Sequence, residues 1–310
     1  MTNQAFEVDL TVKLGPLTLQ NPVTTASGTF GYGVEYAPYC DIGRLGAVMV
    51  KGINLEPRIG HPQPRLAETA SGLLNCIGLQ NIGVNAFIRD MLPFFNGLKT
   101  ACIVNINGST IDEYIAVAEK LSGHSSVAAL EINVSCPNVS QGGITFGIDP
   151  FMTEKVTREI RNRTRLPLIV KLSPNVTDIT VIARAAVNGG ADSLSLINTL
   201  LGMAIDPNSR KSKLSNMTGG LSGPAIKPIA LRCVWQVHKA VSVPIIGMGG
   251  ISSGLDAIEF MLAGSSAVSI GTANFTDPAI STKILDEMLA YCRQYKINKI
   301  ESLVGQLLEA

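Results

Sequence analysis

The sequence predicts an α/β fold, a (β/α)8 TIM barrel with an N-terminal hairpin and inserted active-site loops. Short apolar runs recur eight times along the chain, and segments with helical spacing lie between most of them. Eight buried strands that alternate with helices are typical of this barrel. Polar or glycine residues also follow nearly every run at the same end, which in a barrel is the face that carries active sites. A doubly wound open sheet is the alternative, and the count of eight strands favours the barrel.

The expected strands share a short, buried, β-branched character; they are residues 22–26, 47–51, 102–106, 128–133, 167–171, 193–197, 244–247 and 267–270. The expected helices include residues 150–163, 176–188, 225–240, 255–263 and 280–293. Residues 8–20 alternate around Gly15-Pro16 and predict a hairpin that acts as a plug or lid. Two long connections, 52–83 and 200–223, are expected to be ordered loops that cover a ligand. With no linker in sight, we expect one domain over residues 1–310.

The composition excludes several classes of function. A net charge of +1 over 310 residues offers no basic surplus for nucleic acid or an anionic membrane. No apolar run is long enough to span a bilayer, and the N-terminus shows no export signal. The six cysteines are scattered without a CxxC pair, which predicts free thiols in the cytoplasm and no iron–sulfur motif within this chain.

A cysteine follows the fourth expected strand. Residues 129–132 form its largely apolar part, and Cys136 precedes Pro137. The residue before a proline is pushed out of the helical region, so the thiol is expected in an extended turn at the barrel mouth. A buried structural cysteine is the commoner interpretation of such a residue by itself. No histidine ends a strand and no metal site is expected, so Cys136 is the best candidate for a general base.

Two glycine-rich turns follow the last two strands. Gly249-Gly250 comes after the seventh strand and Gly271-Thr272 after the eighth. Backbone N–H groups at such turns can hold an anion, and a barrel commonly binds phosphate at this place. The pattern predicts the phosphate of a cofactor or of a sugar.

Lysines and amides are concentrated at the expected mouth. Lys51 and Lys171 each end an apolar strand, where a lysine is costly without a partner. Two such cations predict an anionic ligand or an anionic transition state. The amides are Asn75, Asn105, Asn133, Asn138 and Asn198, with Thr199 beside the last. Such a ring suits a flat ligand with alternating carbonyl and N–H edges, such as a pyrimidine, although Asn75 and Asn138 could be plain turn residues.

At these residues the chain resembles the class 1 dihydroorotate dehydrogenases over essentially its whole length. Asn133-Val134-Ser135-Cys136-Pro137-Asn138 is similar to the catalytic loop of that family. Segments 26–31, 64–65, 74–81, 171–178 and 219–225 resemble more specifically the NAD-linked class 1B catalytic subunit. Two departures lie on the substrate loop: Cys76 stands where the family usually has alanine, and Ile82 where it usually has proline.

The resemblance implies a barrel that binds FMN and oxidises dihydroorotate to orotate in de novo pyrimidine (UMP) biosynthesis. It also implies an electron-transfer subunit that carries FAD and a [2Fe-2S] cluster and passes electrons to NAD+. The expected assembly is a heterotetramer of two catalytic and two electron-transfer chains.

The resemblance also implies roles for single residues. Cys136 would take the C5 proton while the C6 hydride goes to flavin N5, and Lys171 would lie at the flavin N1/O2 edge. The residues expected to hold substrate are Lys51, Asn75, Cys76, Ile77, Gly78, Leu79, Asn133, Asn198 and Thr199. The residues expected to hold FMN are Ser27, Lys51, Gly52, Asn105, Asn133, Lys171, Ile197, Gly223, Gly249, Gly250, Gly271 and Thr272.

Three alternatives stay open at this point. One is the class 1A arrangement, a homodimer that uses fumarate without a partner chain. Another is a barrel in which Cys136 attacks a nucleotide covalently, as in inosine monophosphate dehydrogenase-like enzymes. The third is a protein that binds a phosphorylated ligand without catalysis.

Overall fold

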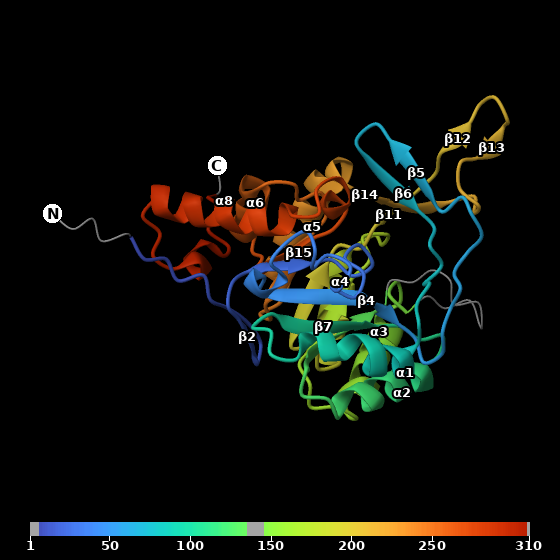
Figure 1. Cartoon of the computed structure of the whole chain (residues 1–310), viewed down its shortest axis with the longest axis horizontal. Coiled ribbons are helices and arrows are strands. Elements are labelled where there is room, and N and C mark those ends of the chain that lie inside the picture. Colours follow the sequence, from blue (N-terminus) through green and yellow to red (C-terminus); the bar gives the residue numbers. More distant parts are fainter. Residues whose placement is uncertain (1–5, 135–145, 309–310) are drawn as a thin grey trace.

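The computed structural model describes residues 6–134 and 146–308. Eight parallel strands close into a barrel with helices packed outside it, in the order β10-β15-β16-β3-β4-β7-β8-β9 (Figure 1). The strands are β3 (Val23–Thr25), β4 (Ala47–Ile53), β7 (Ala101–Ile106), β8 (Val127–Asn133), β9 (Leu168–Lys171), β10 (Ser193–Leu196), β15 (Ile245–Met248) and β16 (Ala267–Ile270). Each overlaps one of the eight expected strands, so the predicted (β/α)8 barrel is confirmed.

The main helices are α2 (Ile111–Ser122), α3 (Pro150–Arg161), α4 (Ile179–Asn188), α5 (Lys227–Ala240), α6 (Gly254–Leu262) and α8 (Ile280–Gln294). Shorter helical turns are α1 (Val84–Ala86), η1 (Ile42–Arg44), η2 (Phe87–Met91), η3 (Leu92–Phe95), η4 (Pro224–Ile226), α7 (Ala273–Thr276) and η5 (Ile300–Leu303). In the part of the chain that is described, no helix has the length and apolar character needed to cross a membrane.

Capping side chains set the helix starts. The expected helix from residue 176 begins instead at Ile179, because the Asp178 carboxylate accepts a hydrogen bond from the Thr180 N–H at 2.9 Å. The helix expected from residue 225 begins at Lys227, because Pro224 opens a short 3-10 turn before it. These two differences move helix boundaries only and leave the order of elements unchanged.

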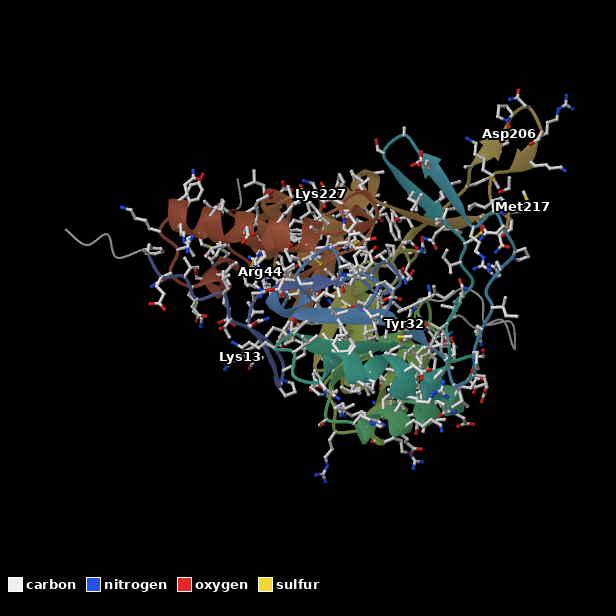
Figure 2. The ribbon with its side chains drawn as sticks, in the orientation of Figure 1. Lys13, Tyr32, Arg44, Asp206, Met217 and Lys227 are labelled. Atoms are coloured by element: carbon white, nitrogen blue, oxygen red, sulfur yellow. The ribbon has the colours of Figure 1, made fainter. Side chains whose placement is uncertain are left out.

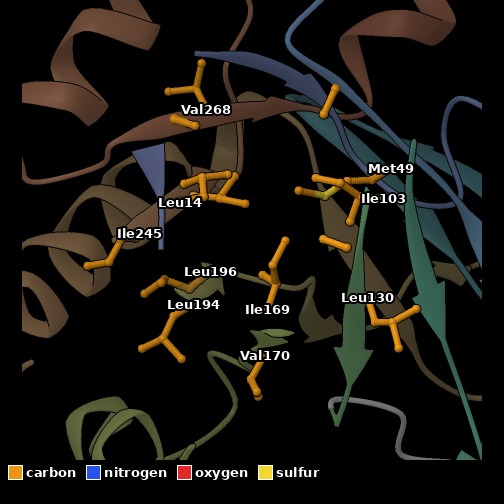
Figure 3. Close-up of a cluster of buried hydrophobic side chains, with 14 of the residues drawn as sticks. Leu14, Met49, Ile103, Leu130, Ile169, Val170, Leu194, Leu196, Ile245 and Val268 are labelled. Atoms are coloured by element: carbon orange, nitrogen blue, oxygen red, sulfur yellow. The ribbon is translucent and has the colours of Figure 1, made fainter. Parts of the chain in front are cut away.

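The barrel interior is filled by apolar side chains from its strands. Figure 3 shows Met49, Ile103 and Ile169 in this cluster, and all three are buried. Leu130 and Leu194 each precede an inward residue, Glu131 or Ser195, so they lie on the outer face of the barrel wall, where they are also fully buried. Parallel strands covered on both faces have no solvent face, which explains their continuous apolar sequence.

The N-terminal hairpin closes one end of the barrel. It pairs β1 (Val12–Leu14) with β2 (Leu17–Leu19), and Gly15 turns between them with a φ of 62°. The Leu14 side chain is 1% exposed and lies among the interior residues of the barrel (Figure 3). Gly15 packs against Asp192, which comes just before β10 begins, so the hairpin lies at the N-terminal end of the strands. The expected plug is confirmed.

The two long connections form a second sheet rather than irregular loops. Strands β5 (Leu66–Thr69) and β6 (Gly72–Asn75) come from the first connection, and β11 (Leu200–Gly202) and β14 (Gly219–Ser222) from the second. They pair in the antiparallel order β11-β14-β6-β5. A small hairpin, β12 (Ile205–Asp206) and β13 (Lys211–Ser212), projects beyond this sheet, where Figure 2 shows Asp206 and Met217. Because β4 and β10 lead into these connections, the inserted sheet stands at the C-terminal end of the barrel.

Candidate functional site

Lys171 lies inside the mouth of the barrel. It is the last residue of β9, and its side chain is only 5% exposed. The Lys171 ammonium donates a hydrogen bond to the Ser27 hydroxyl at 3.2 Å, so the ends of β3 and β9 meet here. The lysine head is therefore kept from solvent, and the expectation that a lysine in an apolar strand has partners is correct.

Four asparagines form a connected set at the strand ends. The Asn133 amide donates to Asn107 at 2.9 Å, and the Asn107 amide donates to Asn105 at 3.3 Å. On the other side the Asn198 amide donates to Asn133 at 3.5 Å. The backbone carbonyl of Asn133 accepts the Tyr114 hydroxyl at 2.7 Å, which fixes the end of β8. The structure thus brings together Asn105, Asn133 and Asn198 as predicted, and adds Asn107.

The carboxylate of Glu131 joins this set, and the sequence analysis gave it no role. It is fully buried on β8, one inward position before Asn133. The Ser195 hydroxyl donates to one carboxylate oxygen at 2.6 Å and the Asn105 amide to the other at 2.5 Å. The Lys171 ammonium lies 3.9 Å from the same carboxylate. A glutamate within an apolar strand could have been recognised from the sequence in the same way as Lys171, because a buried charge of either sign requires a partner.

Lys51 occupies a different environment on β4. Its backbone N–H donates to the Gly31 carbonyl at 2.8 Å, in the same loop that carries Ser27. Burial lowers the pKa of the Lys51 ammonium from its ordinary value; the nearby Glu35 opposes this shift and Arg65 adds to it. An anionic partner would stabilise the charged form of this ammonium, which burial disfavours.

Gly52 is needed for the close packing of β4 against the asparagines. A Cβ atom at this position would lie 2.2 Å from the Asn107 amide nitrogen and 2.7 Å from the Asn105 oxygen. Any side chain there would displace the amide set, so this position in the site wall requires glycine.

Residues 75–79, which the sequence analysis expects to hold substrate, are attached to the inserted sheet. The Asn75 amide donates to the Gly220 carbonyl at 3.1 Å, so Asn75 ends a strand and is no turn residue. Thr199 packs directly against Gly220, and its N–H donates to the Asn198 side chain at 2.8 Å. Contacts therefore run from the barrel asparagines through Thr199 to Asn75. Beside them, a pocket is lined by Pro57, Arg58, Ile59, Gly60, His61, Gly78 and Leu79.

The two sequence departures have definite places on this loop. Cys76 is 6% exposed, and its sulfur lies 3.4 Å from the Ser215 hydroxyl. The Ile82 N–H donates to the Tyr32 hydroxyl at 3.3 Å, a bond that a proline could not make. The backbone around Ile77 is held by His61, whose N–H donates to the Ile77 carbonyl at 3.0 Å.

The glycine turns lie together at the end of β15 and β16. Gly249 and Gly250 have φ values of 124° and 79°, and a Cβ atom on Gly250 would lie 2.9 Å from the Gly223 carbonyl oxygen. The Thr272 hydroxyl donates to Ser222 at 2.7 Å, two residues past β16. Gly271 precedes it, and the Ile197 N–H donates to the Met248 carbonyl at 3.0 Å just before the turn.

The donor groups of this turn fit a phosphate. In the part of the chain that the structure describes, the N–H groups of Gly249, Gly250 and Thr272 have no hydrogen-bond acceptor. An anion would satisfy them at a place where barrels bind phosphate. The cations and amides at the same mouth would suit the rest of a flavin nucleotide, so the described residues fit FMN.

The predicted thiol Cys136 and the predicted amide Asn138 lie outside the described residues. Strand β8, which leads to them, ends at Asn133 in the centre of the amide set. Over residues 6–134 and 146–308, no group of three or more His, Cys, Asp or Glu side chains could hold a metal ion.

The structure is a (β/α)8 barrel protein whose mouth, with two lysines, linked amides and a glycine turn rich in N–H donors, fits a flat, anionic ligand. A family profile described as dihydroorotate dehydrogenase matches residues 9–291. The chain belongs to the dihydroorotate dehydrogenase family.

Individual relatives agree with this assignment. A protein of Desulforamulus reducens is 58% identical over 97% of this chain and 99% of its own, and one of Geobacter metallireducens is 54% identical over 96% and 98%. Both are named dihydroorotate dehydrogenase B (NAD(+)), catalytic subunit. The crystal structure of a dihydroorotate dehydrogenase of Eimeria tenella with ferulenol matches with a TM-score of 0.79 at 26% identity, over 98% of this chain and 90% of that one. The resemblance to the class 1B catalytic subunit is confirmed.

Proposed function

We propose that this chain oxidises dihydroorotate to orotate in de novo pyrimidine (UMP) biosynthesis and passes the electrons through a partner subunit to NAD+. The observation that carries the proposal is the 58% identity to a catalytic subunit of that name, across 97% of the chain. The buried cations and linked amides at the mouth supply the chemistry that such a substrate requires.

Bound FMN would supply the hydride acceptor for this reaction. Ser27, Asn105 and Lys171 would hold its ring, and the N–H groups of Gly249, Gly250 and Thr272 would hold its phosphate. The remaining residues assigned to the cofactor are Lys51, Gly52, Asn133, Ile197, Gly223 and Gly271. A fixed ammonium such as Lys171 favours the edge of a flavin that gains negative charge on reduction.

The substrate would be held by residues of the barrel and of the inserted sheet. Lys51 would bind the carboxylate of dihydroorotate. This anionic partner would stabilise the charged form of the Lys51 ammonium, which burial disfavours. Asn133, Asn198 and Thr199 would bind the pyrimidine edge together with residues 75–79. Cys136 would accept the C5 proton as the general base, and lysines at the same mouth would favour its thiolate.

The electron path would leave this chain for a second one. We propose a partner that carries FAD and a [2Fe-2S] cluster, in a heterotetramer of two catalytic and two electron-transfer chains. The six scattered cysteines support this division, because a cluster needs grouped thiolates. The same free thiols suit the cytoplasm, and residues 1–310 would act as one FMN-binding domain with no nucleic-acid or membrane role.

Anaerobic titration of the purified chain with dihydroorotate tests the proposal. The protein should be yellow, and the substrate should bleach the flavin absorbance. Cys136→Ala should keep FMN but bleach about 100- to 10,000-fold more slowly at neutral pH, the usual contribution of a general base. Cys40→Ala removes a half-buried thiol from the loop after β3 and serves as the matched control. A folded protein without affinity for FMN, or normal bleaching by Cys136→Ala, would contradict the assignment.

A further inference from the structure

Glu131 is a fully buried carboxylate at the centre of the site, and no step of the proposed reaction uses it. Each of its oxygens accepts one hydrogen bond, from Ser195 at 2.6 Å and from Asn105 at 2.5 Å. The Lys171 ammonium completes its surroundings at 3.9 Å, with side-chain exposures of 5% for the lysine and 0% for the glutamate.

These contacts tie Glu131 to two residues assigned to FMN. A carboxylate buried this deeply is tolerated when cations and donors satisfy it, and those groups are in turn oriented by it. Glu131 therefore holds the Asn105 amide with its N–H toward β8. It also attracts the Lys171 ammonium, which donates to the Ser27 hydroxyl at 3.2 Å. The ammonium thus has a neutral hydrogen-bond acceptor and a negatively charged neighbour.

We propose that Glu131 is a positioning residue that offsets the charge of Lys171 and thereby lowers the reduction potential of the bound flavin. The inference rests on the proposed function, because it requires FMN at this mouth. An isolated ammonium beside a flavin favours the reduced form, which carries more negative charge. A carboxylate next to that ammonium weakens the preference. Electrons then leave the flavin more readily for the next acceptor.

The test is the midpoint potential of bound FMN in Glu131→Gln. Glutamine has nearly the same shape; its oxygen can accept from Asn105 and its NH2 can donate to the Ser195 hydroxyl, so only the charge is lost. We expect the ratio of the affinity for reduced FMN to the affinity for oxidised FMN to rise at least tenfold. For a two-electron couple this is a positive shift of about 30 mV in the midpoint potential. Glu119→Gln removes an equal charge from the exposed face of α2 and should leave the potential unchanged.

An unchanged or more negative potential in Glu131→Gln would overturn the proposal, as would an equal shift in Glu119→Gln. A wild-type chain that binds no FMN would instead overturn the proposed function. If Glu131→Gln fails to fold, circular dichroism of the cofactor-free double variant Glu131→Gln/Lys171→Gln decides. Recovery of folding when both charges are removed supports the pairing. Failure of both variants shows that the barrel needs Glu131 independently of Lys171 and contradicts the inference.

Discussion

The two lysines at the barrel mouth differ in how their charges are satisfied. Lys171 has a carboxylate 3.9 Å away and a hydroxyl at 3.2 Å. Lys51 is half-buried, and burial lowers the pKa of its ammonium. Lys51 is therefore the cation that gains more from an anionic ligand, which agrees with its assignment to the substrate carboxylate.

Substitution of Lys51 by methionine should weaken orotate binding. A hydrogen bond to a charged group contributes about 1.5–3 kcal/mol, so we expect a loss of about 10- to 100-fold in affinity. Because the folded pKa of Lys51 is depressed, wild-type affinity should also fall as the pH rises through it, beginning below the ordinary value of about 10.4. Titration of the flavin absorbance with orotate at several pH values measures both effects.

Lys13→Met is the control for this experiment, because Lys13 is exposed on the N-terminal hairpin at the other end of the barrel (Figure 2). Equal losses of affinity in the two variants would point to a general effect of charge. A Lys51→Met protein with unchanged affinity would remove Lys51 from the substrate site.

At the scale of elements, the turn after β15 is anchored by a carboxylate on α6. The Lys227 ammonium, from the start of α5, lies 2.6 Å from Asp256 and 3.0 Å from Glu259. The second Asp256 oxygen accepts from the Ser252 N–H at 2.9 Å and from its hydroxyl at 3.0 Å. The Lys227 side chain also packs against Gly250. One carboxylate thus connects α5, α6 and the proposed phosphate turn.

Asp256→Asn should destabilise the fold in a pH-dependent way. Burial raises the pKa of Asp256, but the hydrogen bonds from Lys227 and Ser252 outweigh it, and the net shift is downward. A depressed carboxyl pKa gives stability that is present above the unfolded value of about 3.9 and lost as the pH falls through the folded value. We expect a loss of about 1–2 kcal/mol at pH 7, less than full burial would give, that becomes smaller as the pH is lowered below the unfolded value.

Urea unfolding of the wild type and the variant at pH 7 and at a series of lower pH values measures this difference. Asp286→Asn breaks the surface pair with Arg44, in which both side chains are substantially exposed, and should cost less than about 1 kcal/mol. If Asp256→Asn were as stable as Asp286→Asn at pH 7, the anchoring of the turn would be wrong.

The same elements show what sequence alone could predict. The eight barrel strands could be read from the chain, because buried parallel strands are continuous apolar runs. The inserted sheet could not, because Asn75 pairs with Gly220, 145 residues further along. The strand-end lysines and amides could be predicted from their position. Glu131 was missed, although an acidic residue in an apolar strand carries the same signal, and Asn107 needed its contacts with Asn105 and Asn133 to be recognised.

At the scale of the whole molecule, the barrel and the inserted sheet complete one mouth from opposite sides. Strands β4 and β10 lead from the barrel wall into that sheet, and Thr199 connects the amide set to it. Over residues 6–134 and 146–308, the five cysteines are free and no metal-binding cluster of His, Cys, Asp or Glu is present. The described residues therefore hold no group of thiolates of the kind that binds an iron–sulfur cluster.

This organisation predicts that the purified chain alone reduces an artificial dye with dihydroorotate but reduces NAD+ negligibly. Co-expression with its partner should yield a complex at low salt that shows flavin and iron–sulfur absorbance and reduces NAD+ at a rate close to that of dye reduction. Parallel assays with fumarate separate this arrangement from a self-sufficient homodimer, since only the latter turns over fumarate without a partner. Rapid fumarate reduction by the chain alone would contradict the proposed partner subunit. It would not contradict the proposed oxidation of dihydroorotate at the barrel mouth, because that half-reaction needs only residues of this chain and FMN.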